Sequence, residues 1–281
     1  MTYQYTNDIK EGKRFEFGKN WSKLLENIDE NRITEAENSL RRMLNITNLD
    51  GKRFIDIGSG SGLFSLAARR LGADVYSFDY DNQSVACTKE LRSRYFPKDE
   101  NWNIEQGSVI DSNFLKSLGQ DWDIVYSWGL LHHTGSMKQA LENVSLLVGD
   151  SGKLFIAIYN DQGRKSNLWL LVKKAYNKLP HGLKWVILIP AFIRLWGPTS
   201  LRDLIALKPF YTWRNYSKLS TRGMSAWRDV VDWVGGLPFE VAKPEDIFNF
   251  YRDQGFTLEK MITCAGGHGC NEYVFEKSNQ L

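Results

Sequence analysis

The chain alternates between short apolar segments and longer segments whose apolar residues recur at helical spacing. The predicted strands cover residues 53–57, 73–79, 102–109, 122–128 and 153–159. The predicted helices cover residues 32–45, 63–71, 83–95 and 136–148. Strands that alternate with helices in this way indicate βαβ units, and hence a parallel sheet with right-handed crossovers.

The alternation stops at Asn160 and returns near residue 243. The stretch between them contains no convincing strand, but it has helical segments at 167–179, 183–196 and 201–207. A helix over 243–255 then precedes two strands, 256–264 and 271–277, which a tight turn joins as an antiparallel hairpin. The pattern therefore predicts one α/β domain with a helical insertion between its fifth and sixth strands.

Composition places the chain among ordinary soluble globular proteins, with 42% apolar and 25% charged residues. Its three cysteines, Cys87, Cys264 and Cys270, do not make a disulfide scaffold and fit a reducing compartment. The polar first residues contain no apolar secretory signal. The longest apolar run, 185–193, is far shorter than the roughly 20 residues of a spanning helix. We therefore expect a cytoplasmic protein.

Charge is concentrated in the insertion, although the net charge of the chain is only +3. Residues 163–222 contain twelve Lys or Arg and a single acid, Asp203. The same segment carries four tryptophans, Trp169, Trp185, Trp196 and Trp213. A segment that is both basic and aromatic indicates an anionic partner.

The clearest candidate for ligand chemistry is the segment 54–63, FIDIGSGSGL, between a predicted strand and a predicted helix. Gly58, Gly60 and Gly62, with Ser59 between the first two, let a backbone approach a ligand closely. The helix that follows presents free N–H groups. Asp56 precedes the loop, and Asp79 ends the next strand, where an acid can accept hydrogen bonds from both hydroxyls of a ribose. Alone, such a loop could be merely a tight connection.

This segment resembles the first motif of the class I S-adenosylmethionine-dependent methyltransferases, and the likeness covers about residues 50–160 and 240–278. The resemblance implies a Rossmann-like seven-stranded sheet and S-adenosylmethionine as cofactor. It implies that the glycine loop holds the methionine part, that Asp56 supports the loop or the amino group, that Asp79 holds the ribose, and that Tyr80 lies against the adenine.

Two further segments carry the resemblance. Gly107, Ser108 and Val109 fall where the family has Gly-Asp and an apolar residue near the adenine amino group; Ser108 departs from that pattern. Residues 122–134, WDIVYSWGLLHHT, resemble the fourth-strand motif of small-molecule methyltransferases, notably those of quinone biosynthesis. The predicted segments are then an N-terminal strap and helix (1–49), the cofactor-binding core (50–160), a basic helical insertion acting as a substrate lid (161–240), and a terminal helix and hairpin (241–281).

Parallel strands bring their carboxyl ends to one edge of a sheet, where ligands bind. The fourth strand places Ser127, Trp128, His132 and His133 at that edge, and the turn after the sixth strand places His268 there. We expect Ser127 and Trp128 to line the cofactor site. Histidine titrates near neutrality, so His133, His132 and His268 are candidate bases for an acceptor hydroxyl or ammonium.

Structural roles are open for these three histidines, which could cap a helix or satisfy a turn. His133 stands where quinone-type relatives also have histidine, whereas His132 replaces their usual glutamate. Cys264, His268 and Cys270 offer three ligands for zinc without a fourth, so no metal site is predicted.

The insertion admits several interpretations. It could be a lid with solvated lysines outside, a recognition surface for an anionic or lipid-linked acceptor, or a surface that contacts an anionic membrane. Binding of nucleic acid by the insertion is a less favoured hypothesis. Residues 15–21 either fold over the cofactor as a lid or form a packed N-terminal strap. Residues 229–236 either line the acceptor pocket or cap a helix and make a turn.

The sequence thus favours a methyltransferase acting on O or N of a small metabolite with a sugar-like or quinone-like acceptor. The alternatives are an RNA-modifying methyltransferase, a catalytically silent cofactor-binding protein, and a nicotinamide oxidoreductase. The last is disfavoured because Leu63 stands where the dinucleotide fingerprint has its third glycine.

Overall fold

The computed structural model describes residues 2–25, 28–219 and 225–278. Its seven strands form one sheet in the order β3-β2-β1-β4-β5-β7-β6, in which β7 is antiparallel to both of its neighbours and the other pairs are parallel. The strands are β1 (Arg53–Ile57), β2 (Asp74–Asp79), β3 (Trp102–Gln106), β4 (Trp122–Trp128), β5 (Val148–Tyr159), β6 (Phe256–Ile262) and β7 (Cys270–Lys277). This is the Rossmann-like seven-stranded arrangement that the sequence predicted.

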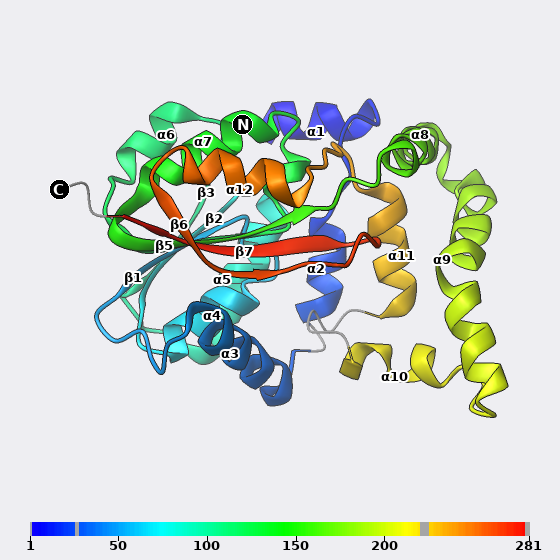
Figure 1. The fold of residues 1–281 in the computed structure, drawn as a ribbon, viewed down its shortest axis with the longest axis horizontal. Helices are drawn as coiled ribbons and strands as arrows, with labels where there is room; N and C mark the ends of the chain where they lie inside the picture. Colours follow the sequence, from blue (N-terminus) through cyan, green and yellow to red (C-terminus); the bar gives the residue numbers. More distant parts are fainter. Residues whose placement is uncertain (1, 26–27, 220–224, 279–281) are drawn as a thin grey trace.

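Helices cover both faces of the sheet (Figure 1). One layer packs on the apolar cluster that contains Phe54 and Trp102, and its helices are α3 (Glu30–Leu44), α4 (Leu63–Arg70) and α5 (Asn82–Tyr95). The other layer packs on the cluster that contains Val125 and Tyr251, and its helices are α6 (Ser112–Ser117), α7 (Met137–Leu147) and α12 (Pro244–Arg252).

The remaining helices lie at one end of the sheet (Figure 1). They are α1 (Thr2–Lys10) and α2 (Gly18–Leu25) before the sheet, and α8 (Arg164–Lys178), α9 (Trp185–Ile205), α10 (Tyr211–Leu219) and α11 (Ala226–Gly235) between β5 and α12. The short 3-10 helices are η1 (Leu131–His133) and η2 (His181–Leu183). The predicted helical insertion between the fifth and sixth strands is therefore confirmed.

Several local predictions were wrong. One helix, α9, replaces the two expected at 183–196 and 201–207, and it continues through Pro190 and Pro198. The third strand ends at Gln106, so Ser108 and Val109 lie in the following loop. The pattern did not predict α1, α2, α6, α10 and α11, which are short helices that depend on tertiary contacts for their stability.

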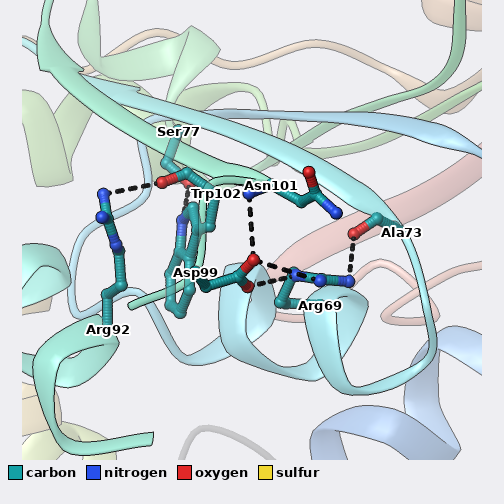
Figure 2. Close-up of polar contacts among 7 residues, drawn as sticks. All are labelled: Arg69, Ala73, Ser77, Arg92, Asp99, Asn101 and Trp102. Atoms are coloured by element: carbon teal, nitrogen blue, oxygen red, sulfur yellow. Dashed lines mark hydrogen bonds and ion pairs between the residues drawn. The ribbon is translucent and has the colours of Figure 1, made fainter. Parts of the chain in front are cut away.

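A polar cluster fastens the β3 edge of the sheet (Figure 2). The Arg69 guanidinium pairs with the Asp99 carboxylate and also donates to the Ala73 carbonyl at 3.1 Å. This pairing holds the pKa of Asp99 below its usual value. Arg92 donates to the Trp102 carbonyl at 2.8 Å, and the Trp102 indole donates to Ser77 Oγ at 2.9 Å. The cluster therefore ties the loop before β3 to α4 and the end of α5.

Candidate functional site

A pocket lies at the carboxyl ends of β1, β2 and β4, where the loops after these strands meet the N-terminal segment and the insertion. It contains about 1190 Å³ of free space, counting the part open to solvent. The site residues predicted from sequence that line this pocket are Asp56, Gly58, Ser59, Gly60, Asp79, Tyr80, Trp128, His132 and His133.

The glycine loop between β1 and α4 requires glycine for conformational and steric reasons. Gly58, Gly60 and Gly62 have φ values of 84°, 56° and 80°, a region that disfavours other residues. A Cβ at Gly58 would stand 2.7 Å from Leu130, and one at Gly60 would stand 3.1 Å from the Trp21 ring. The loop backbone thus lies against its neighbours with no room for side chains.

Asp56, at the start of this loop, is buried and ends a chain of hydrogen bonds that begins at the β3 edge. The Trp102 indole donates to Ser77, Ser77 donates to Ser65 at 2.8 Å, and Ser65 donates to the Asp56 carboxylate. Figure 2 shows the first of these bonds. Burial raises the pKa of Asp56 to about 7 despite the Ser65 hydrogen bond. The carboxyl is therefore held in place and poised to change charge near neutral pH.

Asp79, at the end of β2, organises the second side of the pocket. Its Oδ2 accepts from the Gly60 amide at 3.0 Å, and its Oδ1 accepts from the Asp81 amide at 2.9 Å. Burial raises the pKa of Asp79 to about 6, although both amides favour the carboxylate. One carboxylate thereby joins the glycine loop to the loop after β2.

The two adjacent histidines after β4 occupy different chemical environments. His133 Nδ1 lies 2.6 Å from the Pro238 carbonyl, which can only accept, so Nδ1 carries the proton and Nε2 carries the lone pair in the neutral ring. His132 is fully buried, and its Nδ1 accepts from the Tyr159 amide at 3.3 Å. The neutral His132 ring therefore has its proton on Nε2. Only His133 has the tautomer that suits a general base at Nε2.

The insertion contributes a carboxylate to the same pocket. Asp232, in the last turn of α11, is buried and lines the pocket, and it accepts a hydrogen bond from the Asn20 side chain. Two residues of α8 hold this end of α11. The Lys173 ammonium donates to the Trp233 carbonyl, and the Asn177 amide donates to the Gly235 carbonyl at 2.7 Å. The end of α11 is thus fastened at the edge of the pocket.

The N-terminal segment covers the opening of the pocket. The Gly18 amide donates to Asp81 Oδ2 at 2.9 Å, and the Phe15 amide donates to the Leu237 carbonyl at 3.0 Å. Arg14 donates to the His133 carbonyl at 3.2 Å and lies 5.1 Å from the centre of the Tyr80 ring. Residues 14–18 therefore join the loop after β2 to the segment that follows α11.

Comparison with known proteins identifies the family to which the chain belongs. A family model described as a methyltransferase domain matches residues 28–206, more than half of the chain. The chain belongs to the methyltransferase domain family. The predicted class I S-adenosylmethionine-dependent family and its cofactor are thereby confirmed.

Among curated relatives, a ubiquinone biosynthesis O-methyltransferase of Coxiella burnetii is 29% identical over 136 residues, which cover 48% of this chain and 55% of that protein. A ribosomal protein L11 methyltransferase of Helicobacter hepaticus is 31% identical over 109 residues, which cover 36% of this chain and 33% of that protein. The chain thus spans about half the length of the ubiquinone-type relative and a third of the other.

Solved structures share the fold at low identity. Magnesium protoporphyrin IX methyltransferase from Synechocystis PCC 6803 has a TM-score of 0.51 at 15% identity, with 88% of this chain and 83% of that chain covered. PKMT2 from Rickettsia typhi has a TM-score of 0.56 at 12% identity, with 88% of this chain and 53% of that chain covered. These likenesses identify the arrangement of strands and helices.

The pocket of this methyltransferase domain fits a nucleoside that carries a positively charged sulfur. Gly58 and Gly60 line the pocket, so their backbone is available to a ligand without a side chain in between. The Asp79 carboxylate suits a ribose diol, and the Asp56 carboxyl adds negative charge when ionised. The aromatic rings of Trp21 and Tyr80 line the same space and suit an adenine face. The residues present therefore match the family's cofactor.

Five predicted site residues do not line the pocket. Gly62 begins α4 and would clash with Thr88 if it carried a Cβ, and Ser127 is fully buried with its hydroxyl donated to the Ile57 carbonyl at 3.0 Å. Ser108 lies in the loop after β3, and Val109 packs in the core beside α7.

His268 is exposed in the turn before β7, and its ring lies beside the rings of Trp169 and Trp233, at centroid distances of 5.7 and 5.3 Å. Partial desolvation of the ring and nearby cations lower the pKa of His268. Within the described residues, no group of three or more His, Cys, Asp or Glu side chains is arranged to hold a metal ion.

Sequence reasoning missed several pocket residues, among them Arg14, Asp81 and Tyr159. Asp81 carried a signal, because Asp79 and Asp81 flank Tyr80 at the start of a helix that Asp81 caps. Tyr159 also carried a signal, because it ends the predicted fifth strand at the edge where ligands bind. Arg14 carried none, because its approach to the pocket depends on contacts between distant segments.

Proposed function

We propose that this chain is an S-adenosylmethionine-dependent methyltransferase that methylates an oxygen or nitrogen of a small metabolite. The observation that carries the proposal is that one pocket is lined by two sets of residues from different elements. Asp56, Asp79 and the glycine loop come from the ends of β1 and β2, and we call them the cofactor half; His133 and Asp232 come from the segment after β4 and from α11, and we call them the acceptor half. The first half suits the cofactor, and the second half presents a base and a carboxylate to an acceptor.

In the cofactor half, Asp79 accepts the ribose hydroxyls, Tyr80 contacts the adenine, and the glycine loop with Asp56 holds the methionine part. When bound, S-adenosylmethionine supplies a methyl group on a positively charged sulfur. The role of the chain is then to place a nucleophile in line with that group and to exclude water. The N-terminal segment, with Phe15, Phe17 and Trp21 on the pocket wall, serves the exclusion of water.

In the acceptor half, His133 Nε2 takes the proton of the acceptor as its oxygen or nitrogen attacks. The Pro238 carbonyl holds the ring by its Nδ1 proton and stabilises the imidazolium that forms. Asp232 accepts a hydrogen bond from a second donor group of the acceptor. His132 supports the strand end through the Tyr159 amide and does not act as the base.

The walls of the acceptor half favour a ring. Phe17, Trp128 and Tyr159 line it, and Phe17 and Tyr159 both lie against the His133 ring, at centroid distances of 4.9 and 5.3 Å. Aromatic walls with one carboxylate suit a hydroxylated sugar-like or quinone-like ring. The curated ubiquinone-type relative supports a ring that carries a hydroxyl group.

The test is transfer of an isotopically labelled methyl group from S-adenosylmethionine in an extract of small metabolites, followed by mass spectrometry. We expect one labelled low-mass product with the wild-type chain and none with Asp232→Asn, while both proteins bind the cofactor in calorimetry. Label that enters only RNA or protein contradicts the proposed acceptor class. A wild-type chain that does not bind S-adenosylmethionine contradicts the proposed activity itself.

A further inference from the structure

The longest helix of the insertion, α9, has apolar residues on its outer side as well as on its inner side, and it lies at the outer edge of the molecule (Figure 1). Its inner stripe contains Leu188, Ala191 and Trp196, which are buried in the apolar cluster of the insertion. That inner stripe explains why the helix forms and where it packs. It does not explain the apolar residues on the opposite side.

The outer stripe of α9 recurs at three- and four-residue spacing and is exposed. Ile193 is 61% exposed and Leu204 is 58% exposed. The residues of this outer surface, which we call the α9 face, are Trp185, Val186, Ile189, Ile193, Leu201, Leu204 and Ile205. Soluble proteins seldom expose a continuous apolar stripe of this length without a partner. The charged residues near the α9 face indicate which kind of partner covers it.

Three exposed cations lie on α9 or just beyond its end. Arg194 and Arg202 are exposed on the helix itself, next to Ile193 and Leu201 in sequence. Lys208 is exposed just beyond the end of the helix. The one acid of residues 163–222, Asp203, is buried and accepts from the Thr212 amide and hydroxyl at 2.7 and 2.8 Å. This part of the surface thus has cations and apolar side chains but no exposed acid among the described residues.

We propose that the α9 face docks on an anionic lipid bilayer, with the helix axis in the plane of the membrane surface. Apolar side chains enter the headgroup boundary, and Lys and Arg beside them pair with anionic lipids, as in basic amphipathic helices. Trp185, which is 58% exposed at the start of α9, is of the residue type that favours this boundary. A second copy of the chain is disfavoured as the occupant, because a symmetric contact would bring the two sets of cations together.

Docking brings the acceptor half of the pocket near the lipid surface. The inner stripe of α9 packs on the same cluster as Val230 and Val234 of α11, and Asp232 of α11 lines the pocket. One helix layer, about 8–10 Å between axes, therefore separates the docked helix from the helix that carries Asp232. This geometry serves an acceptor that is anchored in, or delivered from, the bilayer.

No helix within the described residues is long and apolar enough to cross a membrane. The surface contact proposed here involves one face of α9, while its other face stays packed in the protein. It does not depend on methyl transfer, because none of its residues touches the cofactor half of the pocket.

The test is co-sedimentation of the full chain with phosphatidylcholine vesicles that contain about one third phosphatidylglycerol, in the absence of cofactor. We expect binding that weakens with salt and is lost on pure phosphatidylcholine. Arg194→Gln combined with Lys208→Gln should lower the partition coefficient by about 25-fold, since each charge contributes about fivefold near such a surface. Ile193→Glu should lower it by at least about tenfold, because a charge then faces the headgroup boundary.

Matched controls lie on other faces of the chain. Lys98→Gln combined with Lys116→Gln removes two exposed lysines outside the insertion, and Leu146→Glu places a charge at a 60% exposed leucine of α7. Both controls, and Asp79→Ala, should bind vesicles as the wild type does. Circular dichroism and the melting temperature should show that Ile193→Glu is folded.

Three outcomes overturn the proposal. The first is no vesicle binding by the wild type at low salt. The second is an equal loss of binding in the α9-face variants and the controls. The third is a wild-type dimer in sedimentation velocity that Ile193→Glu converts to a monomer, which would assign the face to a second copy. Failure of methyl transfer with retained vesicle binding would contradict only the proposed function.

Discussion

The sheet core and the helical insertion bury their apolar residues to different extents. The core encloses its apolar residues between two helix layers, and Phe54, Val125 and Phe275 are fully buried. The insertion encloses only the inner side of α9 and leaves Ile193 and Leu204 in solvent. A sheet with two apolar faces needs cover on both, whereas one apolar helix beside a small cluster keeps an open side. The core therefore covers its apolar residues with its own helices, whereas the insertion leaves an apolar surface that a partner can cover.

Both regions send carboxylates into the pocket, but only the insertion carries an excess of cations. The core brings Asp56 and Asp79 to the strand ends, where a cationic cofactor suits them. The insertion carries the excess of cations outside and sends one buried carboxylate, Asp232, inward. The expected effects of substitutions in the two regions therefore differ in kind and in size.

The largest effect should follow from Asp79→Ala in the core. Asp79 is buried, and we propose that its carboxylate accepts two ribose hydroxyls. Its loss should then weaken cofactor binding by about 10³-fold, because charged hydrogen bonds contribute roughly 1.5–3 kcal/mol each. Isothermal calorimetry with S-adenosylmethionine measures it. Asp74→Ala, at the exposed start of the same strand, is the control and should bind normally. Unchanged affinity in Asp79→Ala would remove the ribose assignment.

His133→Ala should lower turnover by about 10²-fold, the lower end of the usual contribution of a general base, with cofactor affinity unchanged. His132→Ala should instead lower the melting temperature, because it leaves a cavity in a fully buried site and removes the acceptor of the Tyr159 amide. Single-turnover kinetics and thermal melts separate the two effects. Normal turnover in His133→Ala would show that the acceptor needs no base from this residue.

Lys173 allows a test of the insertion alone. Burial lowers the pKa of Lys173 to about 7, while the Asp232 charge opposes that shift. The unfolded chain then binds more protons than the folded chain between about pH 7 and 10.5, so stability rises with pH in that window. In Lys173→Met this slope should vanish, giving the wild type a relative gain of about 3–4 kcal/mol from pH 7 to pH 10. Urea unfolding at several pH values measures the gain, and parallel curves for the two proteins would contradict it.

The smallest expected effect is the change of cofactor affinity with pH. Burial raises the pKa of Asp79 to about 6 and that of Asp56 to about 7, so both carboxyls are largely neutral at pH 5. Affinity for a cationic cofactor should rise by about tenfold from pH 5 to pH 8 as they ionise. The same shifts make the cofactor-free protein less stable as the pH rises through this range. Calorimetry across the range, with Asp79→Asn as the control with a flatter profile, tests the trend.

The cofactor half could be predicted from the sequence because its parts are local. Asp56, Gly58 and Gly60 are within five residues of one another, and Asp79 ends the next strand. Parallel strands bring such ends together in any βαβ arrangement. Ser108, Val109 and Ser127 were predicted for the cofactor site but do not line the pocket. Ser127 is buried within β4, whose bounds were predicted correctly, whereas Ser108 and Val109 follow β3, whose end the pattern placed too late.

The acceptor half could be predicted only in part. His133 was identified by its place after the fourth strand, but its tautomer depends on the Pro238 carbonyl, more than one hundred residues away in sequence. Asp232 was one of several open candidates until packing on α8 and the Asn20 contact placed it in the pocket. His268 shares the sheet edge, yet it lies among tryptophans outside the pocket lining.

The amino-acid sequence by itself determined the order of strands and helices, the glycine cradle and the acids beside it, because periodic burial and local backbone conformation depend on neighbours in the chain. Tertiary structure alone decided that residues 14–18 cover the pocket, that α9 is one helix with an open apolar side, and which of two adjacent histidines presents a lone pair. Those features arise because contacts between distant segments stabilise them, and the pattern of neighbouring residues does not reveal such contacts.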